Sequence, residues 1–168
     1  KSKDVGRKIQ TTIMDAGLKP IANLSGHSLD QYTIHAGKTV PNMWTIGSFS
    51  FSENEAFACE PFVTTRNGLG FVRNGKIKNI YALVSRKKTK NEKADRLVEY
   101  IWNNFNMLPF ALRWLVKEWE EKEARELLEI LVKKKVVHAY AILVEANGKT
   151  VAQAEHTFIP TQTGVTVT

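Results

Sequence analysis

The chain has 168 residues, 43% of them hydrophobic, which is enough for one domain with a sizeable core. No run of 18 apolar residues exists, which excludes a membrane-spanning segment, and the single cysteine, Cys59, excludes an internal disulfide and fits a reducing compartment such as the cytoplasm. The formal net charge of +7 indicates either a nucleic-acid or ribosomal partner or, more often, a solvated surface rich in lysine and glutamate.

The first predicted element is a helix over residues 4–16. Val5, Ile9 and Ile13 recur at helical spacing, and Gly17 follows as a C-terminal stop signal. An extended segment is expected after this helix, because Lys-Pro follows the glycine almost at once.

Two residues of chemical interest lie in the next part of the chain. His27 comes directly after a glycine among small and apolar neighbours, within residues 23–28. Residues 56–63 read Ala-Phe-Ala-Cys-Glu-Pro-Phe-Val, an apolar run that predicts a buried strand. A carboxylate is rarely buried without a partner, so Glu60 is expected either to pair with an arginine or lysine or to hold a metal ion.

Asn-Gly at residues 67–68 marks a turn after the apolar run. Two further Asn-Gly pairs predict tight turns between strands, since these residues supply the two positive φ values of a type I′ turn. The first pair, at residues 74–75, predicts a hairpin over residues 71–77. The second pair, at residues 147–148, predicts a hairpin that joins residues 140–145 to residues 150–159.

The composition between the two hairpins becomes rich in Glu, Lys and Leu, which predicts helices. Apolar residues from Leu97 to Phe105 form one helical stripe, and Pro109 marks the start of a second helix. Residues 123–135 predict a third helix, with acids early and lysines late as the helix dipole favours. We therefore expect a helical insert or subdomain between two parts of one domain. The three parts are residues 1–88, 89–138 and 139–168.

Glu155 is a second carboxylate within a largely apolar run, on the same predicted strand face as Gln153. One histidine and two glutamates, each in a near-apolar setting, form a nitrogen-and-carboxylate set suited to Mn, Fe, Co or Zn. We therefore expect His27, Glu60 and Glu155 to converge on one point, although 33 and 95 residues separate them.

Four motifs in this order carry a resemblance to a known family. They are Asn-Leu-Ser-Gly-His-Ser at 23–28, Tyr-Thr-Ile-His-Ala-Gly-Lys-Thr-Val-Pro at 32–41, Phe-Ala-Cys-Glu-Pro-Phe at 57–62 and Ala-Glu-His-Thr at 154–157. The chain resembles the type 2 methionine aminopeptidases over essentially its whole length. The helical insert distinguishes this type from type 1 and from the creatinase-like and proline-specific peptidases of the same fold. The resemblance implies an α/β (α+β) chain that forms half of the pita-bread fold, with an antiparallel sheet, covering helices and the insert.

The resemblance also implies roles for individual residues. His27, Glu60 and Glu155 match three of the family's five ligands to two divalent metal ions, which are Co, Mn, Fe or Zn. Glu60 and His35 match catalytic residues, Glu60 as a general acid/base and His35 as a hydrogen-bond donor to the substrate. The implied substrate-binding residues are Ile34, His35, Phe62 and Tyr140.

No stretch of the chain matches the family's N-terminal half, which supplies two aspartate ligands. The resemblance therefore implies the C-terminal part of an enzyme that removes the initiator methionine, inactive without an N-terminal half that is a separate chain or a removed segment. The expected partners are that half, the N-terminus of a nascent protein and the ribosome. The alternative is a metal-free pita-bread pseudoenzyme that acts as an RNA- or protein-binding module. The three matching ligands count against this alternative.

Overall fold

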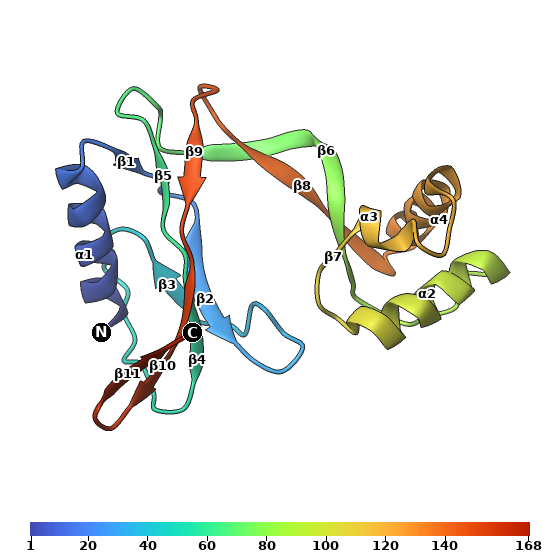
Figure 1. The fold of residues 1–168 in the computed structure, drawn as a ribbon, viewed down its shortest axis with the longest axis horizontal. Helices are drawn as coiled ribbons and strands as arrows, with labels where there is room; N and C mark the ends of the chain where they lie inside the picture. The colour runs from blue at the N-terminus through green and yellow to red at the C-terminus, as the bar shows by residue number, and fades with distance from the viewer. The chain divides into compact units, whose positions relative to one another are not determined.

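The computed structural model describes all residues from Lys1 to Thr168, and the chain divides into two compact units (Figure 1). The first unit consists of Lys1–Arg73 and Leu143–Thr168, and the second consists of Asn74–Ile142. Each unit contains helix, strand and buried apolar residues. None of the helices combines the length and the apolar composition that a membrane span requires.

The first unit opens with helix α1, Ser2–Asp15, which confirms the predicted N-terminal helix with slightly different ends. Ile13 is buried on this helix. Gly6 lies against the backbone carbonyl of Met43, where an added Cβ would collide. The missing side chain therefore lets α1 pack closely on the segment that contains Met43.

Two antiparallel sheets complete the first unit. The five-stranded sheet has the order β11-β10-β4-β2-β3, and the three-stranded sheet has the order β1-β5-β9. Their strands are β1 Lys19–Pro20, β2 Ser25–Leu29, β3 Thr39–Pro41, β4 Ala56–Cys59, β5 Phe62–Thr64, β9 Val151–Gln153, β10 His156–Thr161 and β11 Gly164–Val167. Phe57 of β4 is fully buried, and its ring packs against those of Phe49, Phe51 and Phe158.

The strand predicted over residues 56–63 is interrupted in its middle. Glu60 and Pro61 separate β4 from β5, because a proline has no N–H to donate and cannot continue a ladder. The predicted return strand is interrupted in the same way, since Ala154 and Glu155 separate β9 from β10. Both carboxylates of the predicted site therefore lie where the chain passes from one sheet to the other.

The second unit combines a three-stranded sheet, in the order β7-β6-β8, with three helices. Its elements are β6 Val72–Leu83, α2 Glu92–Phe105, β7 Phe110–Ala111, α3 Leu112–Leu115, α4 Glu121–Lys133 and β8 Val137–Glu145, of which β6 and β8 extend into the first unit. Helices α2 and α4 confirm two of the predicted helices. The helix predicted to start at Pro109 begins later, as the four-residue α3, after strand β7. Leu97 and Ile101 of α2 are buried in one cluster with Leu128 and Leu131 of α4. The helical section thus builds the core of this unit.

Neither Asn-Gly pair forms the predicted hairpin. Strand β6 runs through residues 74–75 without a turn, so that prediction is wrong. A Cβ on Gly75 would meet the Ile142 side chain of β8, which shows that this glycine serves the close approach of two strands. At residues 147–148 a turn does form, closed by a 2.8 Å hydrogen bond from Gly148 N to Glu145 O. Strand β9 nevertheless pairs with β5 instead of returning along β8.

Candidate metal centre

The two strand interruptions lie opposite each other in the first unit. Cys59 pairs with His156 on one side of the gap, and Phe62 pairs with Gln153 on the other side. A 3.3 Å hydrogen bond from the Ala154 N–H to the Pro61 carbonyl joins the two interruptions. The register therefore places Glu60 beside Glu155, although each belongs to a different part of the sequence.

Gln153 links these two carboxylates. Its Nε2 lies 3.2 Å from Glu60 Oε2 and 3.2 Å from Glu155 Oε2, so the amide can donate one hydrogen to each. The sequence placed Gln153 on the same strand face as Glu155 but gave no sign of this contact. The role was missed because it depends on the pairing of β9 with β5, which is not a local property of the chain.

His27 approaches the same carboxylates from strand β2, where it pairs with Ala58 of β4. Its Nε2 lies 3.1 Å from Glu60 Oε1, and the two side chains are only 15% and 13% exposed. Its Nδ1 lies 3.3 Å from the carbonyl of Ser28. The Ser28 carbonyl and an ionised Glu60 carboxylate both only accept, so these two contacts compete for the single N–H of the neutral ring.

Glu60 has no lysine or arginine beside it, and its one basic contact is His27. Burial, and then the neighbouring Glu155, raise the pKa of Glu60 to about 7. No lysine or arginine lies within 4 Å of either carboxylate, so the ion pair considered for Glu60 does not form. The buried Asn42 holds the backbone in place by donating to the carbonyl of Glu60 over 3.0 Å.

His35 stands beside His27 at the edge of this group. The two rings meet edge to face with their centroids 4.3 Å apart. Burial, and then the proximity of His27, lower the pKa of His35, so this ring is neutral at pH 7 and can donate one hydrogen bond. Both histidines line a hollow of about 310 Å³. Its other lining residues are Asn23, Leu24, Ser25, Gly26, Gly37, Lys38 and Thr39.

The remaining predicted substrate residues are spread over both units. Ile34 precedes His35 and is half-buried, and Phe62 lies on β5 directly opposite Gln153. Tyr140 belongs to the second unit, on β8, where its ring packs edge to face on His138 at 4.4 Å. A shared methionine pocket formed by these residues stays a prediction.

The arrangement of donors fits a divalent cation. His27 Nε2 lies 3.1 Å from Glu60 Oε1, and the Gln153 amide joins Glu60 to the second carboxylate, Glu155. A nitrogen and carboxylate set of this kind suits Mn, Fe, Co or Zn. No group of three or more His, Cys, Asp or Glu side chains closes around a single point as a ready metal cluster. Gln153 occupies the space between the two carboxylates instead.

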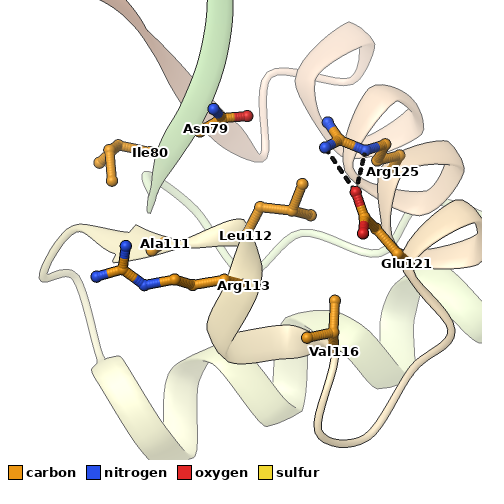
Figure 2. Close-up of a pocket in the computed structure, with 8 residues that line it drawn as sticks. All are labelled: Asn79, Ile80, Ala111, Leu112, Arg113, Val116, Glu121 and Arg125. Atoms are coloured by element: carbon orange, nitrogen blue, oxygen red, sulfur yellow. Dashed lines mark hydrogen bonds and ion pairs between the residues drawn. The ribbon is translucent and has the colours of Figure 1, made fainter.

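Figure 2 shows a different pocket, which lies in the second unit and has a volume of about 240 Å³. The guanidinium of Arg125 binds Glu121 there through two hydrogen bonds of 3.0 and 2.7 Å, so its charge is already matched. The pocket contains none of the residues predicted for catalysis or metal binding. Its lining residues are Asn79, Ile80, Ala111, Leu112, Arg113, Val116, Glu121 and Arg125.

Comparison with known proteins identifies relatives for nearly the whole chain. No family model matches it. The chain is 36% identical over 165 residues to a methionine aminopeptidase of Methanocaldococcus jannaschii, with 98% of this chain and 54% of the relative covered. It is 38% identical over 167 residues to the methionine aminopeptidase of Thermococcus kodakarensis, with 99% and 56% covered. The chain thus spans about half the length of the curated relatives it matches.

Two solved structures share the fold. A thermophilic Arx1 superposes with a TM-score of 0.78 at 14% identity, over 98% of this chain and 44% of the other. The methionine aminopeptidase of Rickettsia prowazekii superposes with a TM-score of 0.55 at 14% identity, over 99% and 42%. The mixed helix and antiparallel sheet architecture, half of a pita-bread fold, is confirmed.

Proposed function

The chain belongs to the methionine aminopeptidase family, and on this premise we propose that it is the C-terminal part of a metal-dependent enzyme that removes the initiator methionine from nascent proteins. The observation that supports the proposal is the chain of contacts among these side chains: His27 Nε2 lies 3.1 Å from Glu60 Oε1, and the Gln153 amide bridges Glu60 to Glu155. Nothing else in the first unit offsets the charge of these carboxylates.

We propose that His27, Glu60 and Glu155 hold the divalent metal ions, Co, Mn, Fe or Zn, together with groups from the N-terminal half. Such ions activate a water molecule and polarise the scissile carbonyl when they are bound. Glu60 can hold or release a proton near neutral pH, which suits a residue that passes a proton to the leaving amine. His35, neutral and beside His27, donates a hydrogen bond to the substrate carbonyl.

The methionine side chain would be held by apolar groups on several elements. We assign this role to Ile34, Phe62 and Tyr140, together with His35. Phe62 has support from the fold, because it lies across the ladder from Gln153 and so belongs to the same strand interruption as the two carboxylates.

The proposed partners are an N-terminal half, either a separate chain or a removed segment, and the emerging N-terminus of a nascent protein in the cytoplasm. The ribosome is a further partner, since nascent chains emerge there. The half is required because three donors are too few for two metal ions. We therefore propose that the chain alone does not hydrolyse methionyl peptides.

A reconstitution experiment tests this function. The chain is mixed with an N-terminal half that bears two aspartates, in the presence of Mn²⁺, and release of methionine from a Met-Ala-Ser peptide is measured. We expect activity only in the mixture, and Glu155→Ala should abolish it, whereas Glu53→Ala, an exposed glutamate outside the site, should keep it. Full turnover by the chain alone would contradict the half-enzyme proposal, and no turnover in the mixture would contradict the assignment as a peptidase.

The second candidate function is a metal-free binding module. The presence of His27, Glu60 and Glu155 argues against it, since a module without metal has no need of uncompensated carboxylates in a half-buried site. The observation in its favour is the unequal distribution of positive charge between the two units.

A further inference from the structure

The positive charge of the chain is concentrated in the second unit. Residues Asn74–Ile142 contain fifteen lysines and arginines and nine aspartates and glutamates, a net charge of +6. The other 99 residues contain nine basic and eight acidic side chains, a net charge of +1. A solvated surface of evenly mixed charge, the more frequent explanation of a basic sequence, does not produce this asymmetry.

Within the second unit, basic side chains gather along a groove made of two adjoining hollows, of about 420 and 310 Å³. The hollows are continuous because Lys78, Val132 and Ala139 line both. One wall is β6 and the other is the end of α4, with β8 beside them. The lining residues are Lys76, Lys78, Tyr81, Val84, Arg125, Glu129, Val132, Lys133, Lys135, Val137, His138 and Ala139.

Four of these side chains, Lys76, Lys78, Lys133 and Lys135, define what we call the lysine groove. All four are exposed, and none makes an ion pair within 4 Å. The only acidic residue that lines the groove is Glu129. The positive charge of the groove is therefore largely uncompensated within the chain.

We propose that the lysine groove binds the phosphate backbone of a nucleic acid. Lys76 and Lys78 stand two residues apart on one strand, which separates them by about 7 Å, comparable to successive phosphates along one strand of a nucleic acid. Lys133, the last residue of α4, and Lys135, just beyond that helix, supply a second row. A lysine ammonium is a point charge and lacks the planar, two-pronged guanidinium with which arginine recognises a single carboxylate. The groove therefore suits a polymer that carries one charge on every monomer.

The residues that line the groove also indicate whether it would distinguish one base sequence from another. The only aromatic rings that line the groove are those of Tyr81, which is buried and donates its hydroxyl to the carbonyl of Lys78, and His138, which packs on Tyr140. Tyr81 is buried, and the single exposed imidazole of His138 is not a series of aromatic platforms on which successive bases could stack. The groove therefore recognises the backbone without reading sequence, and its affinity depends steeply on salt.

Fluorescence anisotropy with a labelled duplex RNA tests the proposal on the full chain, with a chelator present so that the metal centre does not contribute. We expect the logarithm of the association constant to fall linearly with the logarithm of the KCl concentration. Lys78→Gln with Lys135→Gln should weaken binding about tenfold and lower the salt slope by about 2, one for each lysine that no longer neutralises a phosphate. Lys117→Gln with Lys122→Gln removes the same charge from the same unit but lies outside the groove, and should change the affinity far less.

Three results would overturn the proposal. They are no salt-dependent binding of the duplex, equal reductions of affinity in both double variants, and displacement of the RNA by poly-glutamate as effectively as by unlabelled RNA of equal charge. The last would assign the groove to acidic proteins. The same measurement with a DNA duplex of the same sequence shows whether the groove binds the phosphate backbones of both RNA and DNA. Circular dichroism confirms the fold of each variant, and the outcomes are independent of the proposed peptidase activity because every lysine changed belongs to the second unit.

Discussion

Glu60 is a carboxyl group that burial and the neighbouring Glu155 hold at a pKa of about 7 in the folded chain. The unfolded chain binds this proton less tightly, with a pKa near 4.5. The stability that the protonated group contributes is therefore fully present below pH 4.5 and is lost as the pH rises through about 7. Without metal, the chain should become less stable over this pH range.

Glu60→Gln tests that dependence, since the amide is neutral at every pH. The free energy of unfolding, measured by urea denaturation at pH 5 and pH 8 in the presence of a chelator, should fall less in the variant than in the parent chain. Glu53→Gln, an exposed glutamate, is the matched control and should follow the parent. Identical pH profiles for parent and Glu60→Gln would refute the raised pKa.

Gln153 is expected to position the two proposed carboxylate ligands. Gln153→Leu keeps the approximate size but cannot donate to Glu60 or Glu155, so the carboxylates lose the group that now holds them in place. Mn²⁺ binding, measured by calorimetry at pH 7, should weaken about tenfold or more, as is usual when an outer hydrogen-bond partner of a metal ligand is removed.

Gln31→Leu provides the comparison for this change. Gln31 is an exposed glutamine outside the site, and its replacement should leave the Mn²⁺ affinity unaltered. If Gln153→Leu bound Mn²⁺ as tightly as the parent chain, the bridge between the carboxylates would have no role in metal binding.

A separate prediction concerns the packing of strand β6, because Gly75 allows this strand to pass close to β8. A Cβ at this position would lie 2.7 Å from Ile142 Cγ1 and 3.1 Å from the Ile142 carbonyl, and the carbonyl cannot move without disturbing the strand. Gly75→Ala should lower the free energy of unfolding by about 1–3 kcal/mol, the usual cost of overpacking. Gly47→Ala, where nothing lies within 4 Å of the added Cβ, should change it little. Equal stability of the two variants in urea would contradict the close packing of β6 and β8.

The elements that the sequence predicts well are those that depend on local pattern. Helix α2 follows from an apolar stripe and α4 from its early acids and late lysines, and Asn91 adds a local cap to α2 by accepting a hydrogen bond from Ala94 N. The Asn-Gly pair at residues 74–75 misled because the same residues suit either a turn or a crowded strand, and only the position of Ile142 decides. Pro61 did offer a signal for the break beside Glu60, since proline interrupts a ladder.

The candidate site was predictable in its residues but not in its geometry. His27, Glu60 and Glu155 each stand out as polar groups in apolar runs. Their placement depends on the pairing of β4 with β2 and β10, and of β5 with β9, which joins residues far apart in the chain. The bridge through Gln153 follows from that pairing alone.

For the molecule as a whole, the two units differ in chemistry. The first unit contains every predicted metal ligand and almost no net charge, and the second contains a helical core and a net charge of +6. We expect metal binding to depend on the first unit and nucleic-acid binding on the second. Lys78→Gln with Lys135→Gln should accordingly leave the Mn²⁺ affinity intact, which calorimetry can check.

The most direct test of the proposed metal centre is a crystal structure of the chain grown with Mn²⁺, with anomalous data that locate the ion. The predicted result is an anomalous peak about 2.0–2.3 Å from Nε2 of His27 and bonded to carboxylate oxygens of Glu60 and Glu155. A peak elsewhere on the chain, with His27 and Glu60 still hydrogen-bonded to each other, would contradict it.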